Sequence, residues 1–137
     1  MWLILLHASQ RVEAQLESAL SQSGLSIAKL GVLRHLVAAG EPLPLGKLAE
    51  RMSCVKSNIT QLVDRLEADG LVARLGDPSD RRSVLAEITP DGRERFTRGA
   101  DIVEAIEADV FGSLAPEDRE RLESTLLLIG APCSEER

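Results

Sequence analysis

The chain has 137 residues and a net charge of −6, and 44% of its residues are hydrophobic but only 2% aromatic. That length suits one domain, and a core with so few aromatic side chains must be built from Leu, Ile, Val and Ala, which favours packed helices. No apolar run approaches the roughly 20 residues that a membrane-spanning helix needs. The apolar start at residues 2–6 is also too short for a signal peptide, so we expect a cytoplasmic protein.

The cysteines and histidines give no sign of a disulfide framework or a metal site. Cys54 and Cys133 stand alone, and His7 and His35 lie 28 positions apart, whereas metal-binding motifs place their ligands at short, fixed spacings. The sequence also lacks a P-loop, a nucleophile elbow and a dinucleotide-binding fingerprint. We therefore predict no metal, no cofactor and no enzymatic activity.

The acidic residues are concentrated in the C-terminal quarter of the chain. Residues 99–136 carry ten acidic and two basic side chains, whereas residues 47–98 carry nine acidic and ten basic ones. Binding to nucleic acid depends on the local charge of a surface as well as on the total charge. The net charge weakens affinity for DNA in general, but it does not exclude a locally positive surface in the middle of the chain.

The spacing of apolar residues predicts two helices at the start of the chain. The first covers residues 2 to about 22, and its apolar first turn needs cover from its own chain or from a second subunit. Ser26 is placed to cap the second helix, which runs to about Ala39 and ends at Gly40.

A short third helix covers residues 45–52, and a tight turn leads into a fourth helix over residues 53–69. Ser53 is placed to cap the fourth helix, and Gly70 is placed to end it. The fourth helix carries one apolar stripe, formed by Val55, Ile59, Leu62, Val63 and Leu66. Two helices joined so closely, the second with a polar outer face, are typical of a helix-turn-helix.

Two short strands, residues 71–75 and 83–89, are predicted after the fourth helix, joined by a charged turn over residues 76–82. A helix with a polar face followed by an arginine-tipped hairpin is the outline of a winged helix-turn-helix. The predicted fold class is therefore mainly α with a small β-hairpin wing, in a single domain over residues 1–137.

Two further helices are predicted after the wing. Thr89 is placed to cap a long helix over about residues 90–111, and Pro90 suits its first position. A second start signal at Pro116 begins a final, leucine-rich helix that runs to Gly130.

The order of these motifs resembles the MarR family of bacterial transcription regulators. The matching text is LGVLRHL, LGKLAERM and SNITQLVDRLEADGLVARLGDPSDRRSVLAEITPDG. The resemblance covers residues 25–95 by motif and the whole chain by the order of its helices. It implies a winged helix-turn-helix DNA-binding core over residues 25–92, flanked by dimerisation helices over residues 1–24 and 93–131.

The resemblance also implies a function. Such proteins are homodimers whose N- and C-terminal helices interlock. Each recognition helix would enter a major groove of double-stranded DNA and each wing arginine the adjacent minor groove, on a pseudo-palindromic operator. Many members repress their targets and release DNA when a small, often anionic aromatic ligand binds. The expectation is a homodimeric repressor that is released by a small-molecule effector, for instance a phenolic one, and that has no membrane partner.

DNA contacts are expected first on the outer face of the fourth helix. These candidates are Ser53, Lys56, Ser57, Asn58, Thr60, Gln61 and Arg65. Family members often have arginine where this chain has Gln61, and glutamine pairs with adenine rather than guanine, so the preferred operator should differ. Arg65 has an alternative role, because it can pair with Asp69 one turn further on.

The second set of candidates, Ser79, Asp80, Arg81 and Arg82, lies on the wing. Arg82 matches the Asp-x-Arg pattern of the family's wing and is the candidate for insertion into a narrow, A·T-rich minor groove. Arg81 and Ser79 are candidates for contacts with the DNA backbone. Asp80 cannot attract DNA itself and is expected to hold an arginine in place.

Two other functions compete with this interpretation. The acidic balance and Gln61 favour a winged-helix protein interaction module without DNA binding. A redox-sensing repressor would act through Cys54, because a thiol at a helix N-terminus can have a lowered pKa. Peroxide-sensing relatives place their cysteine in the first helix, where this chain has none, which favours a structural Cys54.

Overall fold

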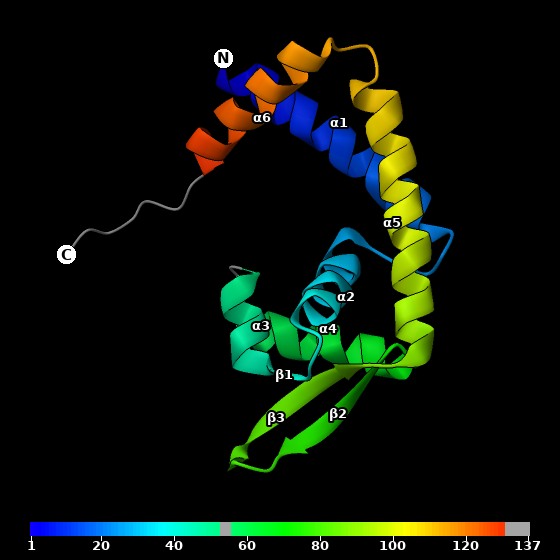
Figure 1. Ribbon diagram of the computed structural model, residues 1–137, viewed down its shortest axis with the longest axis vertical. Coiled ribbons are helices and arrows are strands. Elements are labelled where there is room, and N and C mark those ends of the chain that lie inside the picture. The colour runs from blue at the N-terminus through cyan, green and yellow to red at the C-terminus, as the bar shows by residue number, and fades with distance from the viewer. Residues whose placement is uncertain (53–55, 131–137) are drawn as a thin grey trace, which may run out of the picture. The chain divides into compact units, whose positions relative to one another are not determined.

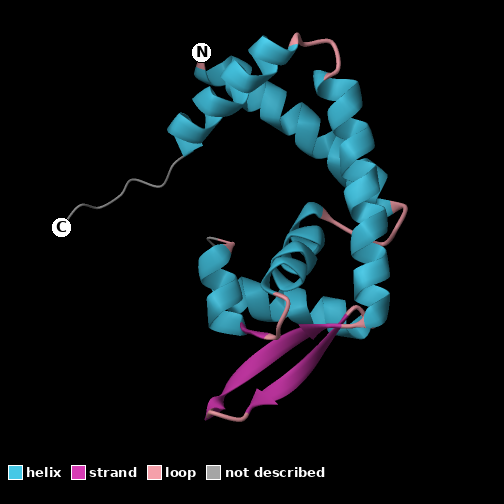
Figure 2. Ribbon diagram, viewed as in Figure 1, coloured by secondary structure: helices cyan, strands magenta, loops and turns pink. Residues whose placement is uncertain are grey.

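The computed structural model describes residues 1–52 and 56–130, which form two compact units, one over Met1–Val103 and one from Glu104 onward (Figure 1). In chain order the elements are α1 (Trp2–Ser21), α2 (Ile27–Ala39), β1 (Leu43–Pro44), α3 (Leu45–Arg51), α4 (Lys56–Ala68), β2 (Val72–Asp77), β3 (Asp80–Ile88), α5 (Pro90–Phe111) and α6 (Pro116–Gly130). Helices dominate, with one small sheet (Figure 2). None of the described helices is long and apolar enough to cross a membrane.

The helix boundaries follow from the capping residues. The Ser26 hydroxyl accepts a hydrogen bond from the Lys29 N–H at 3.1 Å, which confirms Ser26 as the N-cap of α2. Gly40 ends α2 and Gly70 follows α4, both with the positive φ that glycine tolerates best. The predicted cap of α4, Ser53, lies outside the described residues.

The sheet has three antiparallel strands in the order β1-β3-β2. The sequence did not predict β1, a two-residue strand that pairs Leu43 with Ala86. The predicted extent of the wing turn, residues 76–82, is wrong, because only Pro78 and Ser79 lie between the two strands. The charged residues that suggested a turn continue the hairpin instead, since both faces of its outer end meet solvent and need no apolar residues.

The core of the first unit is aliphatic. The most deeply buried side chains, at most 2% exposed, are Leu20, Val32, Leu33, Leu36, Leu48, Ile59, Val63, Leu66, Leu71 and Val72. Three of the five residues in the predicted apolar stripe of α4 are among them, while Leu62 is half-buried and Val55 lies outside the described residues. Burying one such side chain stabilises the fold by about 1.5–3 kcal/mol, so this core fixes the orientation of α4.

The start of α5 is tied to the end of α4. The Thr89 hydroxyl accepts a hydrogen bond from the Gly92 N–H at 3.0 Å, as the sequence predicted, and it donates one to the Gly70 carbonyl at 2.7 Å. A Cβ on Gly92 would lie only 2.1 Å from the Leu71 carbonyl oxygen, so no larger residue fits there. The strand that leaves the wing therefore enters α5 at a fixed place beside the recognition helix.

The second unit comprises the end of α5, from Glu104, and α6. Every residue of α6 is exposed. A groove of about 420 Å³ runs between the two helices, and Phe111, Leu122 and Leu126 line its apolar part. Arg119 and Glu107 form an ion pair at its edge, with an N–O distance of 3.6 Å.

Candidate nucleic-acid interface

The predicted recognition helix presents a polar face to solvent. Opposite its buried stripe lie four exposed residues of the predicted set: Ser57, Asn58, Gln61 and Arg65. Thr60 is half-buried at the edge of this face. Ser53 and the side chain of Lys56 lie outside what the structure describes. The described part of α4 thus brings together short and long polar side chains that can reach base edges and phosphates.

The alternative partner of Arg65 is engaged elsewhere. The Asp69 carboxylate pairs with Lys29 Nζ of α2 at 2.8 Å. Among the described residues Arg65 forms no ion pair, and its side chain is exposed. The geometry therefore favours a contact with phosphate over the local pair with Asp69.

Hydrogen bonds close the tip of the wing. Asp77 Oδ1 accepts one from the Ser79 hydroxyl at 2.7 Å and one from the Ser79 N–H at 2.9 Å. The hydroxyl bond, and to a smaller extent the N–H bond, hold the pKa of the Asp77 carboxyl below its ordinary value. The hydroxyl proton of Ser79 is used within the turn, so Ser79 shapes the tip of the wing.

Asp80 also acts on the backbone. Its Oδ1 accepts a hydrogen bond from the Arg82 N–H at 2.9 Å. Asp80 thus contacts the main chain of Arg82, and no ion pair between Asp80 and a guanidinium occurs in the described part of the chain. The hydrogen bond uses only the backbone N–H of Arg82, and its side chain remains exposed.

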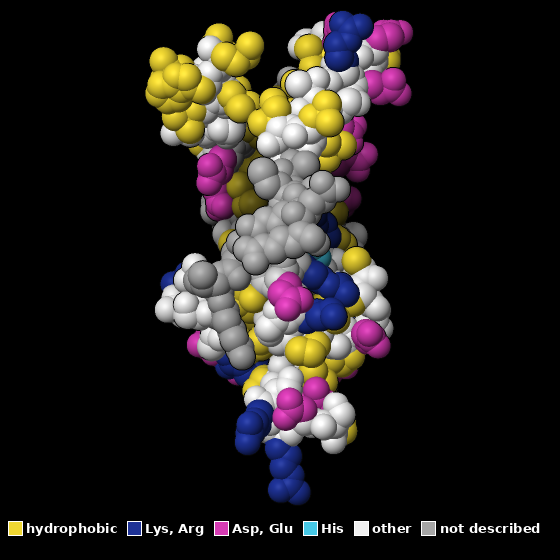
Figure 3. Space-filling view, turned by 90° about the vertical axis from the view of Figure 1, so that its left-hand side faces the viewer, with side chains coloured by type: hydrophobic (Ala, Val, Ile, Leu, Met, Phe, Trp, Pro, Cys, Tyr) yellow, Lys and Arg dark blue, Asp and Glu magenta, His cyan; other side chains and the backbone are white. Residues whose placement is uncertain are grey.

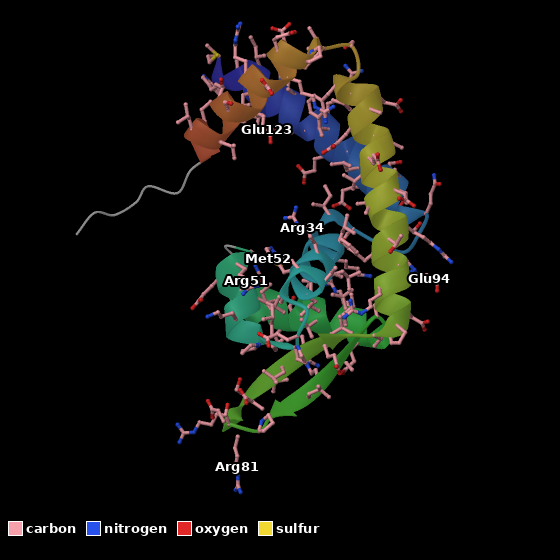
Figure 4. The ribbon with its side chains drawn as sticks, in the orientation of Figure 1. Arg34, Arg51, Met52, Arg81, Glu94 and Glu123 are labelled. Atoms are coloured by element: carbon pink, nitrogen blue, oxygen red, sulfur yellow. The ribbon has the colours of Figure 1, made fainter. Side chains whose placement is uncertain are left out.

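The two wing arginines leave opposite faces of the hairpin. Both are exposed, and side chains alternate along a strand. Arg82 shares a face with the buried residues Ala86 and Ile88, which is the face that the helices cover, and Arg81 lies on the other face. Figure 4 shows Arg81 projecting from the end of the hairpin, where Figure 3 shows Lys and Arg side chains gathered. The different directions suit different roles for two adjacent arginines.

A cleft of about 620 Å³ lies among α1, α2 and the end of α3. Apolar side chains, Leu16, Leu20 and Met52 among them, line part of the cleft, and so do the carboxylates of Glu13 and Glu17. Arg34, His35 and Arg51 form a basic corner; Figure 4 labels the two arginines. Burial lowers the pKa of His35, and the positive charges of Arg34 and Arg51 lower it further. Such a corner beside apolar walls can accept the acidic group of an apolar ligand.

Sequence patterns did not reveal this cleft or the basic corner. Arg34 and His35 were seen only as part of a helix, and Arg51 follows them by more than a dozen residues. Neither did the sequence single out Arg74 of β2, which forms ion pairs with Asp64 and Glu67 of α4. Only the strand register and the packing of α3 on α2 bring these groups together.

No cluster of three or more His, Cys, Asp or Glu side chains that could hold a metal occurs within residues 1–52 and 56–130. Cys54, the candidate for a redox role, and Cys133 both lie outside the described residues.

Comparison with known proteins identifies the family. The model of the MarR family matches residues 25–84. The uncharacterized HTH-type transcriptional regulator YkoM of Bacillus subtilis (strain 168) is 32% identical over 101 residues, which cover 74% of this chain and 65% of that protein. The chain thus spans slightly less than two thirds of the length of this relative.

Solved structures share the fold. CouR from Rhodococcus jostii RHA1, bound to p-coumaroyl-CoA, is 30% identical with a TM-score of 0.81, covering 94% of this chain and 90% of that one. A mutant of MarR from E. coli, complexed with operator DNA, has a TM-score of 0.85 at 24% identity, covering 94% and 91% of the two chains, and shows likeness of fold. These neighbours confirm the predicted fold class. The chain belongs to the MarR family.

Proposed function

We propose that this protein is a homodimeric transcription regulator that binds a pseudo-palindromic operator and represses the genes beside it. One observation carries the proposal: a single buried core holds both an exposed polar helix face and an arginine-tipped hairpin. A rigid core of this kind lets two groove-reading elements engage the same duplex together. The partner is double-stranded DNA, which places the protein in the cytoplasm.

The two elements divide the work between the grooves. In the major groove, Gln61 pairs with an adenine edge, and Ser57, Asn58 and Arg65 contact bases or phosphates around it. In the minor groove, Arg82 is drawn to the negative potential of an A·T-rich tract, while Arg81 meets the phosphates. The winged core over residues 25–92 is the reader.

The second copy is supported by the apolar surface at the ends of the chain. Trp2 is 70% exposed, Ile4 73% and Leu128 82%. Large apolar side chains left in solvent in this way mark an interaction surface, and closed two-fold pairs are the commonest oligomers. Residues 1–24 and 93–131 are then the dimerisation segments, and their pairing places two readers about one helical turn of DNA apart.

The cleft between α1, α2 and the end of α3 is the proposed effector site. Its apolar walls and the basic corner of Arg34, His35 and Arg51 suit an apolar or phenolic acid, and CouR, the relative with bound p-coumaroyl-CoA, supports that class. An effector changes DNA affinity only if it binds the operator-competent and the incompetent state with different strength. The ligand would favour a spacing of the two readers that misfits the operator.

The test is selection of duplexes from random DNA, followed by titration of the selected duplex at several salt concentrations. Wild type should select a two-fold symmetric sequence. Its affinity for DNA should fall steeply as the salt concentration rises, because binding releases cations that are condensed on the DNA. Arg82→Ala should weaken binding about tenfold or more, since one good base contact is worth about 1–3 kcal/mol. Repeating the titration with p-coumaroyl-CoA tests the effector class.

Arg98→Ala is the matched control, because it removes the same charge from α5, where Arg98 pairs with Glu94 at 2.7 Å. Equal affinities of the two variants would show that the wing does not read the operator. If the wild-type protein selects no sequence and its binding does not depend on salt, the DNA-binding function is wrong. A protein interaction module would then be the better interpretation.

A further inference from the structure

Arg74, in the middle of β2, contacts α4 at three successive turns. Its Nη2 forms an ion pair with the Asp64 carboxylate and donates a hydrogen bond to the Thr60 carbonyl at 3.3 Å. Its Nη1 lies 3.5 Å from Glu67 Oε1, and its backbone N–H donates to Glu67 Oε2 at 3.0 Å. One residue of the wing thus holds three residues of the recognition helix.

The strand register puts Arg74 in this place. Arg74 pairs with Ala86 of β3, which is fully buried, so its side chain leaves the sheet on the face that the helices cover. Its partners on α4 lie four and three residues apart and therefore form one stripe along the helix. The Arg74 side chain is only 26% exposed, and its planar fork is suited to holding two carboxylates at once.

The same stripe borders the reading face. Asp64 follows Gln61 by three residues, so the two side chains are neighbours on the helix surface. The side chains of Asp64 and Glu67 are 54% and 43% exposed. Two carboxylates beside a surface that meets phosphates would repel DNA unless a cation offsets them. Arg74 is that cation.

We propose that Arg74 is a positioning residue for DNA reading, which holds α4 in a fixed place against the wing and compensates the charges of Asp64 and Glu67. The inference rests on the proposed DNA-binding function. It gives Arg74 an indirect part in that function, because Arg74 would act through α4 without touching a base. The partner carboxylates of Asp64 and Glu67 are 54% and 43% exposed, and ion pairs that are this open to solvent add little to folding stability. A purely structural Arg74 would therefore matter little for either folding or binding, whereas a positioning Arg74 matters mainly for binding.

The test compares Arg74→Ala with the control Arg98→Ala, using the duplex that the wild-type protein selects. Arg74→Ala should bind this duplex roughly tenfold more weakly or worse, because it leaves two uncompensated carboxylates near phosphates. Arg98→Ala breaks an ion pair on α5 whose side chains are 62% and 66% exposed. At protein concentrations where sedimentation shows both variants to be dimers, it should stay within about twofold of wild type. An Arg74→Ala variant that is folded and binds within twofold of wild type overturns the proposal.

A double-mutant cycle separates compensation from general repulsion. Asp64→Asn with Glu67→Gln removes both carboxylates, and this pair of changes is made in wild type and in Arg74→Ala. The gain in affinity should be at least about threefold larger without Arg74 than with it, because only then are the carboxylates uncompensated. Equal gains in the two backgrounds overturn the compensation of charge by Arg74.

Hydrogen exchange tests the clamp without DNA. Arg74→Ala should speed exchange of amide protons in β2 and the middle of α4, while the amides of α2 keep their wild-type rates. Unchanged exchange rates in β2 and α4 overturn the positioning role. This readout does not depend on DNA, so it stays valid if the wild-type protein selects no duplex, which would refute the DNA-binding function instead. Should Arg74→Ala fail to fold, Arg74→Lys takes its place, because it keeps the charge and loses the fork. A loss of about threefold in DNA affinity is then expected, and wild-type affinity overturns the proposal.

Discussion

The reader buries its large apolar side chains, whereas the two ends of the chain expose theirs. Within the described residues, the buried hydrophobic side chains all lie between Leu20 and Ile88, whereas residues 1–11 and α6 contain none. Leu33 of α2 is fully buried, while Leu128 of α6 is 82% exposed. The reader therefore derives its stability from contacts within one chain, and the ends carry apolar surface that one chain leaves uncovered.

This difference indicates where the proposed second copy would pack. A residue whose contacts are all in its own chain should affect stability equally at every protein concentration. A residue that is buried only by association should affect stability in proportion to how much dimer is present. Substitutions in the two regions can therefore be told apart by varying the concentration alone.

The largest effect is expected in the reader. Leu33→Ala removes a fully buried side chain from the core and should lower the free energy of unfolding by about 2–5 kcal/mol. Chemical denaturation at two protein concentrations, tenfold apart, would show the same loss at both. A loss below about 1 kcal/mol would mean that α2 is not part of the core that positions α4.

The next largest effect is expected at the end of the chain. Leu128→Asp puts a charge on α6 where the proposed partner would bury it, and should weaken dimerisation tenfold or more, since an unpaired buried charge costs about several kcal/mol. Sedimentation at a series of concentrations gives the dissociation constant. Ser124→Asp is the matched control, because it places the same charge on α6 at an exposed polar residue. Equal dissociation constants for the two variants would exclude Leu128 from the interface.

Sequence periodicity predicted the helices well and the sheet less well, for a physical reason. The helices are local structures, and their apolar spacing and their caps, such as Ser26 and Thr89, lie within each segment. A two-residue strand containing Pro44 has no pattern of its own and exists only because β3 lies beside it. The outer end of the wing likewise depends on pairing between strands.

In the candidate site, too, features of a single helix could be predicted and features that depend on two packed elements could not. The outer face of α4 could be predicted, because a helix that buries Ile59 and Val63 must expose Gln61 and Arg65. The role of Arg74 depends on the register between β2 and β3, which the sequence does not specify. The basic corner of the cleft depends on α3 packing against α2. Properties of one element were predictable, while properties that join two elements were not.

The smallest effect concerns the pH dependence of stability, and it separates His35 in the reader from His7 on the exposed part of α1. Burial, with Arg34 and Arg51 nearby, lowers the pKa of His35 in the folded protein below its ordinary value of 6.5. Below about pH 6.5 the unfolded chain therefore binds a proton at this position more readily than the folded protein, and stability falls as the pH falls. Above that pH both states are neutral there, and the contribution vanishes.

Wild type should consequently lose more stability between about pH 7.5 and about pH 5.5 than His35→Gln, which cannot be protonated. Urea denaturation of both proteins at the two pH values measures the difference, and acid effects elsewhere in the chain cancel in the comparison. His7→Gln makes the same exchange on the exposed part of α1 and controls for the substitution itself. If His35→Gln and wild type lose equal stability, the basic corner does not act on His35. Only Arg34 and Arg51 would then remain as the proposed binding partners for the acidic group of an effector.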